Sequence, residues 1–271
     1  MIVGNDISKY QGDVDFNVYK NNSNFVIIKA TEGTGYIDPK FSRNQSESRR
    51  VGLPLGYYHF ARPDLGNSPE AEADYFIKTL GEVRDGELLC LDYEPNWNGD
   101  AVSWCGRFLK RVSDKLNGLK CLIYMDQSRV SSIDWSVIAS LGYGLWIASY
   151  TYSPLKNTFK VGAFKYAVMQ QWTNSQIIPG IIGKTDGNVF FGTIETLKKY
   201  GYKKPTPPTP PTDPRDETIK SLIAQLEEAK KTIVSNSQAY DTQLAIVKAD
   251  CQKKLDNIIG KVEEIKVIAN S

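Results

Sequence analysis

The sequence predicts an α/β fold, in which a modified (β/α) barrel of about eight strands is followed by a proline-rich linker and an α-helical segment. Short apolar runs rich in Val, Ile, Leu and Tyr recur along the chain, and helical patterns lie between them. About eight strands in roughly 200 residues are what a small barrel needs. The predicted strands are Ile2–Asp6, Phe25–Ala30, Leu53–Phe60, Leu88–Asp92, Lys120–Met125, Leu145–Ser149, Ala167–Trp172 and Asn188–Phe191.

Two of the intervening segments show clear helical patterns. The segment Pro69–Leu80 has Ser68 at its N-cap and a proline at its first helical position, where no backbone N–H is needed. The segment Trp104–Leu116 is the second predicted helix. Strands that alternate with helices favour a mainly parallel sheet, whose strands end at a common pocket.

Changes of composition divide the chain into three parts. Residues 1–202 form the predicted barrel, residues 203–215 a Pro/Thr-rich linker, and residues 216–271 a helical C-terminal segment. Prolines fix φ and remove hydrogen-bond donors, so the linker is expected to be an extended spacer.

Apolar residues in the C-terminal segment repeat at intervals of three and four, as they do in a coiled-coil seam. The register slips around Ser235–Gln238, which leaves two alternatives: a helical hairpin, or a stutter in one helix of ~55 residues, about 80 Å long. One isolated helix cannot bury so narrow a stripe. We therefore expect a homo-oligomer, or docking to the substrate or another structure. The repeating residues are Ile219, Leu222, Leu226, Ala229 and Ile233, and then Leu255, Ile258, Val262 and Ile265.

The composition excludes several classes of protein. The 33 basic and 31 acidic residues leave a net charge of +2 without blocks of one sign, so we expect no nucleic-acid partner. The start of the chain has no basic segment followed by an apolar one, and no long apolar stretch occurs, which predicts neither a signal peptide nor a membrane span.

The cysteines and the single histidine do not form a metal-binding pattern. Cys90, Cys105, Cys121 and Cys251 show no CxxC spacing, and we expect reduced thiols rather than disulfides or a metal site. His59 has no His or Cys neighbour at ligand spacing, which argues against zinc and against a Ser-His-Asp triad. The sequence predicts no metal and no cofactor.

Two carboxylates follow the apolar run at residues 88–91. Asp92 and Glu94 are two residues apart, so in an extended chain they face one side, and we expect the charge of Asp92 to keep Glu94 uncharged near neutral pH. A neutral acid beside an ionised one is the pair that cleaves glycosidic bonds. Asp6 ends the first predicted strand and Asp186 precedes the last, so four carboxylates are expected at one pocket. The alternative is that the pair lies in a solvated loop.

Aromatic residues lie near the same strand ends. Aromatic rings stack on the apolar faces of sugars while their polar atoms bond hydroxyl groups, so carboxylates and rings together favour a saccharide substrate. Core packing is the alternative for each ring, above all for the two tryptophans, which lie in apolar runs. The candidate substrate-binding residues are Tyr36, Tyr58, Tyr124, Trp146, Tyr150 and Trp172.

Seven motifs in this order resemble the glycoside hydrolase family 25 lysozymes, the Chalaropsis-type muramidases. They are DISKYQG (6–12), IIKATEG (27–33), GYYHF (56–60), LCLDYEP (89–95), LWIASY (145–150), MQQW (169–172) and DGNVF (186–190). The resemblance ends at the linker. It implies a modified α/β barrel that hydrolyses the β-1,4 bond between N-acetylmuramic acid and N-acetylglucosamine in bacterial peptidoglycan.

The resemblance also implies residue roles. Glu94 matches the general acid, and Asp92 matches the carboxylate that orients the N-acetyl group of the substrate. Asp6 and Asp186 match the other acidic positions, and Tyr58 and Tyr124 match sugar contacts. Carboxylates on one side of the sugar favour substrate-assisted attack by the N-acetyl oxygen, and a general base acting on water stays open.

A phage endolysin is the leading hypothesis for the biological role. It would be present in the host cytoplasm before release and act at the bacterial cell wall. A virion-associated lysozyme and a bacterial autolysin are the alternatives. A barrel that binds peptidoglycan without cutting it would need a missing catalytic carboxylate, and all four are present. A chitinase-like enzyme would share the D-x-E arrangement but not the flanking motifs.

Overall fold

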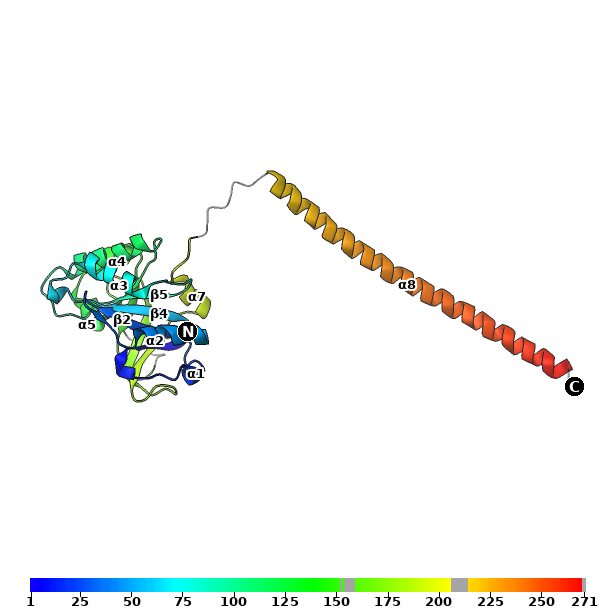
Figure 1. The fold of residues 1–271 in the computed structure, drawn as a ribbon, viewed down its shortest axis with the longest axis horizontal. Coiled ribbons are helices and arrows are strands. Elements are labelled where there is room, and N and C mark those ends of the chain that lie inside the picture. Colours follow the sequence, from blue (N-terminus) through cyan, green and yellow to red (C-terminus); the bar gives the residue numbers. More distant parts are fainter. Residues whose placement is uncertain (152, 154–158, 206–213, 270–271) are drawn as a thin grey trace. The chain divides into compact units, whose positions relative to one another are not determined.

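The computed structural model describes residues 1–151, 153, 159–205 and 214–269 (Figure 1). The chain divides into two compact units, Met1–Pro205 and Thr206–Ser271. Each unit is described by itself below.

The first unit is built on a closed barrel of eight strands. The parallel strands run from β1 to β8, and β9 closes the barrel because it pairs with both β8 and β1. A short additional strand, β3, pairs antiparallel with β2 at the edge. The strands are β1 (Ile2–Ile7), β2 (Phe25–Glu32), β3 (Tyr36–Ile37), β4 (Leu55–Phe60), β5 (Leu88–Asp92), β6 (Leu122–Asp126), β7 (Gly144–Ala148), β8 (Ala167–Gln176) and β9 (Thr185–Phe190). All eight predicted strands are present.

The direction of β9 differs from the parallel arrangement expected for the other strands. It runs antiparallel to both neighbours, so its first residues, rather than its last, lie at the carboxyl ends of the parallel strands. Asp186 is the second residue of β9. It therefore reaches the same end of the barrel as Asp6 and Asp92, which end parallel strands.

Strand alternation separates two apolar cores. In β5, Leu88 and Cys90 belong to the core inside the barrel, whereas Leu89 and Leu91 belong to the core under the helices. Close packing inside the barrel leaves little room: a Cβ at Gly4 would lie 2.5 Å from the carbonyl oxygen of Phe25. Side chains therefore fill the interior of the barrel.

Helices surround the strands (Figure 1). The predicted helix Pro69–Leu80 is present as α3, capped by Ser68. The other predicted helix starts three residues earlier than expected, as α4 (Ala101–Lys115), because the carboxylate of Asp100 caps it. The remaining helices of this unit are α1 (Phe16–Tyr19), α2 (Phe41–Val51), α5 (Gln127–Ser132), α6 (Ser136–Ser140) and α7 (Ile194–Lys199), with 3₁₀ turns at Lys9–Gln11 and Pro63–Leu65.

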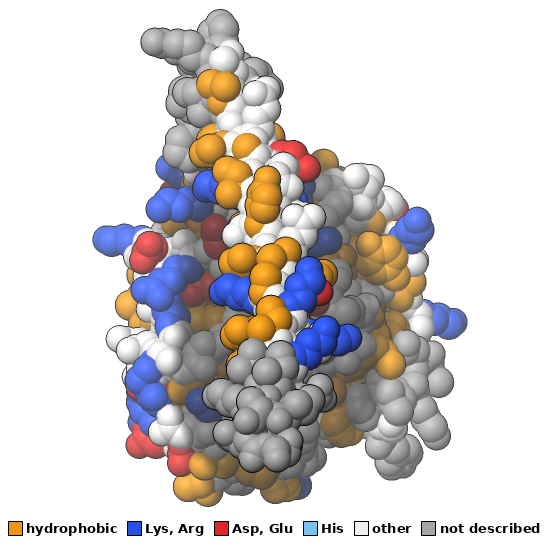
Figure 2. Space-filling view, turned by 90° about the vertical axis from the view of Figure 1, so that its right-hand side faces the viewer, with side chains coloured by type: hydrophobic (Ala, Val, Ile, Leu, Met, Phe, Trp, Pro, Cys, Tyr) orange, Lys and Arg blue, Asp and Glu red, His pale blue; other side chains and the backbone are white. Residues whose placement is uncertain are grey.

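The second unit contains one continuous helix, α8 (Pro214–Ala269). The chain does not turn back at Ser235–Gln238, so the hairpin alternative is wrong and the single-helix alternative is confirmed. Apolar side chains follow one another along α8, with Lys and Arg side chains beside them (Figure 2). In the part of α8 whose side chains are described, these apolar residues are exposed; Leu222 is 58% and Leu244 52% exposed.

The four cysteines are unpaired, and all but Cys251 are buried. No helix in the described ranges combines the length and apolar character needed to cross a membrane.

Candidate active site

A pocket of about 260 Å³ opens at the mouth of the barrel, where the parallel strands end. It contains all four predicted carboxylates and four of the six predicted aromatic residues. The residues that line it are Asp6, Ser8, Tyr10, Gln11, Lys29, Tyr58, Phe60, Asp92, Glu94, Tyr124, Trp146, Tyr150, Gln171 and Asp186.

The Asp92–Glu94 pair faces this pocket as the spacing of two residues predicts. Asp92 is the last residue of β5, and Tyr93 between the two carboxylates points outward and packs edge-on against Trp135, with ring centroids 6.0 Å apart. Arg129 of α5 donates a hydrogen bond to the carbonyl oxygen of Glu94 and pairs with Asp126. The packing of Tyr93 and the hydrogen bond from Arg129 thus fix the backbone that carries Glu94.

Asp6 is held by two amide groups. Its Oδ1 accepts a hydrogen bond from Asn188 Nδ2 at 2.7 Å and from Gln171 Nε2 at 3.0 Å. Both amides are oriented by the aromatic residues of the pocket: Trp146 Nε1 donates to Asn188 at 2.9 Å, and the Tyr124 hydroxyl donates to Gln171 at 2.9 Å. These donors favour the ionised form of Asp6.

The carboxyl group of Asp186 forms a second pair with that of Asp6. The pKa of Asp186 is raised to about 8, first because the group is largely enclosed and then because Asp6 carries a like charge. Burial also raises the pKa of Asp6, while the hydrogen bonds from Asn188, Gln171 and Asp186 lower it. The hydrogen bonds to Asp6 therefore favour Asp186 as the protonated member of this pair.

Burial also raises the pKa values of Asp92 and Glu94. The pKa of Asp92 lies well above its usual range, because the group is buried and because Glu94 is close. For Glu94, burial raises the pKa, while a hydrogen bond with Asp92 and the charge of Arg129 lower it. The pair therefore keeps a proton to higher pH than two free carboxyl groups would.

The cause of this protonation differs from the sequence-based expectation. We expected the charge of Asp92 to keep Glu94 uncharged, but the contact with Asp92 lowers the pKa of Glu94, and enclosure by the barrel mouth raises it. One Asp92 oxygen, Oδ1, is buried and has no hydrogen-bond partner among the described residues. In the free enzyme the hydrogen bond between the two groups favours a proton on Asp92.

The aromatic candidates divide into two groups. Tyr58, Tyr124, Trp146 and Tyr150 line the pocket, and Tyr124 packs edge-on against Trp146 with centroids 4.7 Å apart. Tyr36 lies in β3 and lines a neighbouring cavity instead. Trp172 does not line the pocket either; it follows Gln171 on β8, at the point where the register with β9 shifts.

Several residues of this site were not singled out from the sequence, among them two amides and a lysine. Gln171 and Asn188 lie within the MQQW and DGNVF motifs, and alternation from the inward-facing core position of β9 could have identified Asn188. Lys29 breaks an apolar strand at an inward position, which is an unusual place for a lysine.

The chain resembles known enzymes in sequence and in structure. Residues 5–181 match the model of the glycosyl hydrolases family 25. Lysozyme M1 of Streptomyces globisporus is 41% identical over 211 residues, which cover 72% of this chain and 70% of that protein. The lysozyme of Streptococcus phage Cp-1 is 31% identical over 153 residues, which cover 54% of this chain and 42% of that protein.

The crystal structure of the lysozyme from Streptomyces coelicolor superposes with a TM-score of 0.65 at 27% identity, covering 74% of this chain and 96% of that one. The family match spans most of the barrel that carries the pocket. The chain therefore belongs to glycoside hydrolase family 25, the lysozymes and muramidases, and is an enzyme of that type.

Proposed function

We propose that this enzyme hydrolyses the β-1,4 bond between N-acetylmuramic acid and N-acetylglucosamine in bacterial peptidoglycan, with Glu94 as the general acid. The observation that carries the proposal is the Asp92–Glu94 pair, which lies at the barrel mouth and whose two pKa values are both raised by burial. A carboxylic acid that is still protonated there can donate its proton to the leaving oxygen of a glycosidic bond.

The free oxygen of Asp92 supports a role toward the N-acetyl group of the substrate. An acetamido N–H that donates to Asp92 Oδ1 would stabilise the charge of Asp92 and so shift the shared proton to Glu94. The same contact would aim the acetamido oxygen at the sugar carbon. Substrate-assisted attack is our preferred mechanism, and a general base acting on water is the alternative.

The test of the acid is Glu94→Gln, which keeps the shape of the side chain and cannot donate the proton. We expect a loss of about 10²- to 10⁴-fold in the rate of turbidity clearing of cell walls. Glu82→Gln, at an exposed ion pair away from the pocket, is the matched control and should clear at the normal rate. Near-normal clearing by Glu94→Gln would refute the assignment.

The bond that is cleaved can be read from the products. A muramidase leaves reducing ends on muramic acid, whereas reducing ends on glucosamine would contradict the proposal. Muropeptide analysis of a digest distinguishes the two outcomes.

We propose further that the enzyme acts at the wall as a phage endolysin, in line with the similarity to the lysozyme of Streptococcus phage Cp-1. A virion-associated lysozyme and a bacterial autolysin are the alternatives. Expression inside a susceptible host distinguishes them. An endolysin lyses the cells only when a membrane-permeabilising holin is expressed with it, and lysis without holin would contradict the endolysin role.

We propose that α8 associates with a second copy of the chain. Apart from the polar Ser237, the stripe continues through the slip, because Tyr240, Leu244, Val247 and Cys251 join its two ends. Between positions 219 and 269 the stripe advances by 50 residues in fourteen steps of three or four residues each. The mean step is about 3.6 residues, which is the period of a straight helix. One face of α8 can thus meet the same face of another copy along its whole length. Sedimentation of the full chain tests this, and a monomer at all concentrations would contradict it.

A further inference from the structure

A second cavity, of about 530 Å³, adjoins the active-site pocket. The two share Tyr10 and Lys29 in their walls, so a ligand in the pocket can extend into the cavity. Its walls are formed by residues near the ends of β1, β2 and β4 and by β3. They are Lys9, Tyr10, Lys29, Glu32, Gly33, Thr34, Gly35, Tyr36, Asp38, Arg62, Leu65 and Asn67.

The carboxylates of this cavity are occupied by donors of the chain itself. Glu32 accepts hydrogen bonds from Lys29 Nζ at 2.8 Å and from Arg62 Nη1 at 2.7 Å. The side chain of Asp38 is buried and accepts from the backbone N–H groups of Lys9 at 3.0 Å and Lys40 at 2.9 Å. Few acceptors are left for the hydroxyl groups of a sugar.

Lys9 carries a positive charge that no carboxylate of the described residues pairs with. Its ammonium group lies over the rings of Tyr10 and Tyr36, 5.2 and 5.3 Å from their centroids, and has no carboxylate partner among the described residues. Tyr10 and Leu65 beside it are 81% and 61% exposed. Lys9 hydrogen-bonds to Tyr36 but forms no ion pair among the described residues, so the cavity offers a cation without a carboxylate partner next to exposed apolar surface. Such a surface suits an anionic ligand with an apolar part.

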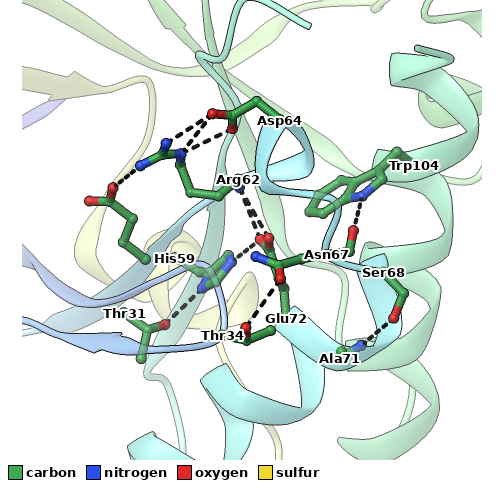
Figure 3. Close-up of polar contacts among 11 residues, drawn as sticks. Thr31, Thr34, His59, Arg62, Asp64, Asn67, Ser68, Ala71, Glu72 and Trp104 are labelled. Carbon is green, nitrogen blue, oxygen red and sulfur yellow. Dashed lines mark hydrogen bonds and ion pairs between the residues drawn. The ribbon is translucent and has the colours of Figure 1, made fainter.

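A buried network fixes the wall that holds Arg62 (Figure 3). Glu72 accepts hydrogen bonds from the backbone N–H of Arg62 at 3.1 Å and from His59 Nε2 at 2.7 Å, and His59 Nδ1 bonds Thr31 at 2.8 Å. His59 and Glu72 are fully buried. The guanidinium of Arg62 is then held between Glu32 and Asp64. The cavity is therefore formed before any ligand binds.

We propose that this cavity binds the stem peptide of the muramic acid residue, with Lys9 pairing with a peptide carboxylate. The proposal rests on the proposed function, because a muramic acid ring in the pocket carries a peptide on its lactyl group that must leave the pocket sideways. Tyr10, Tyr36 and Leu65 contact the apolar side chains of the peptide. The enzyme thus recognises the stem peptide as well as the glycan strand.

The test compares two substrates: uncross-linked glycan strands that carry stem peptides, and the same strands after an amidase has removed the peptides. Lys9→Met removes the charge and keeps the length of the side chain. We expect it to lower kcat/KM about tenfold more on the peptide-bearing strands than on the stripped strands. Lys9→Arg should retain the preference of the wild type, and Lys20→Met, at an exposed lysine after α1, should leave it unchanged.

Amidation of the peptide carboxylates should lower cleavage by the wild type and remove the difference between the wild type and Lys9→Met. An equal loss by Lys9→Met on both substrates would make the cavity a sugar subsite and overturn the proposal, as would no loss on either. If the wild type cleaves neither substrate, the proposed function itself has failed, which is a separate outcome.

Discussion

The carboxyl group of Asp186 should lower the stability of the protein at neutral pH. Its folded-state pKa of about 8 lies above the ordinary value of 3.8, so the folded protein keeps a proton that the unfolded chain loses. A raised carboxyl pKa means that stability falls as pH rises from about 4 to about 8. Each pH unit in that range contributes about 1.4 kcal/mol, which sets an upper limit of about 4 kcal/mol at pH 7.

Asp186 is partly open to solvent, and screening reduces this limit to about 1 to 2 kcal/mol. Asp186→Asn removes the ionisation and keeps a donor for Asp6. We therefore expect the variant to be more stable than the wild type by about 1 to 2 kcal/mol at pH 7 and by much less at pH 4.5, while its activity falls.

Urea unfolding of both proteins between pH 4.5 and pH 8 measures this difference. Asp114→Asn, at an exposed ion pair on α4, is the control and should show no such growth with pH. If the gain in unfolding free energy from Asp186→Asn does not change with pH, or if the variant is less stable than the wild type at pH 7, the reasoning is refuted.

Two further predictions concern the buried network and α8. Glu72→Ala should cost about 3 to 5 kcal/mol of unfolding free energy, because it leaves His59 and the Arg62 N–H without an acceptor. Glu70→Ala, which breaks an exposed ion pair on the same helix, should cost less than about 1 kcal/mol in the same denaturation experiment. Cys251, the only exposed cysteine, lies in the seam of α8, so in a parallel, in-register pair mild oxidation should link two chains through it. Lys248→Cys in a Cys251→Ser background should cross-link less, and equal cross-linking would contradict the register.

The barrel and the acidic pair were predictable because strong local patterns specify them. Eight apolar runs identify the strands, and the alternation of β5 alone places Asp92 and Glu94 on one side and Tyr93 on the other. The same rule does not settle β8, because the consecutive residues Val168 and Met169 both belong to the inner core and the register with β9 shifts after Gln171. The sequence alone therefore did not show that Gln171, and not Trp172, lines the pocket.

Other features depend on contacts between distant segments, which no local pattern contains. The antiparallel direction of β9 is set by closure against β1, and Asp186 reaches the mouth only through that direction. Tyr36 was expected in the pocket, but β3 pairs at the outer edge of β2 and carries it to the next cavity. The continuous α8 could not be told from a hairpin, because both satisfy the same spacing.

The two carboxyl pairs of the pocket differ in one respect that bears on catalysis. Asp6 receives two amide hydrogen bonds from the protein, so contacts within the protein itself favour Asp186 as the protonated member of that pair. Asp92 receives none at its Oδ1 from the described residues, so the position of the proton in its pair depends on what the substrate donates there. We infer that the first pair is a fixed part of the binding pocket. The second pair changes its state on binding, because only there can a substrate N–H stabilise one carboxylate and leave the proton on the other.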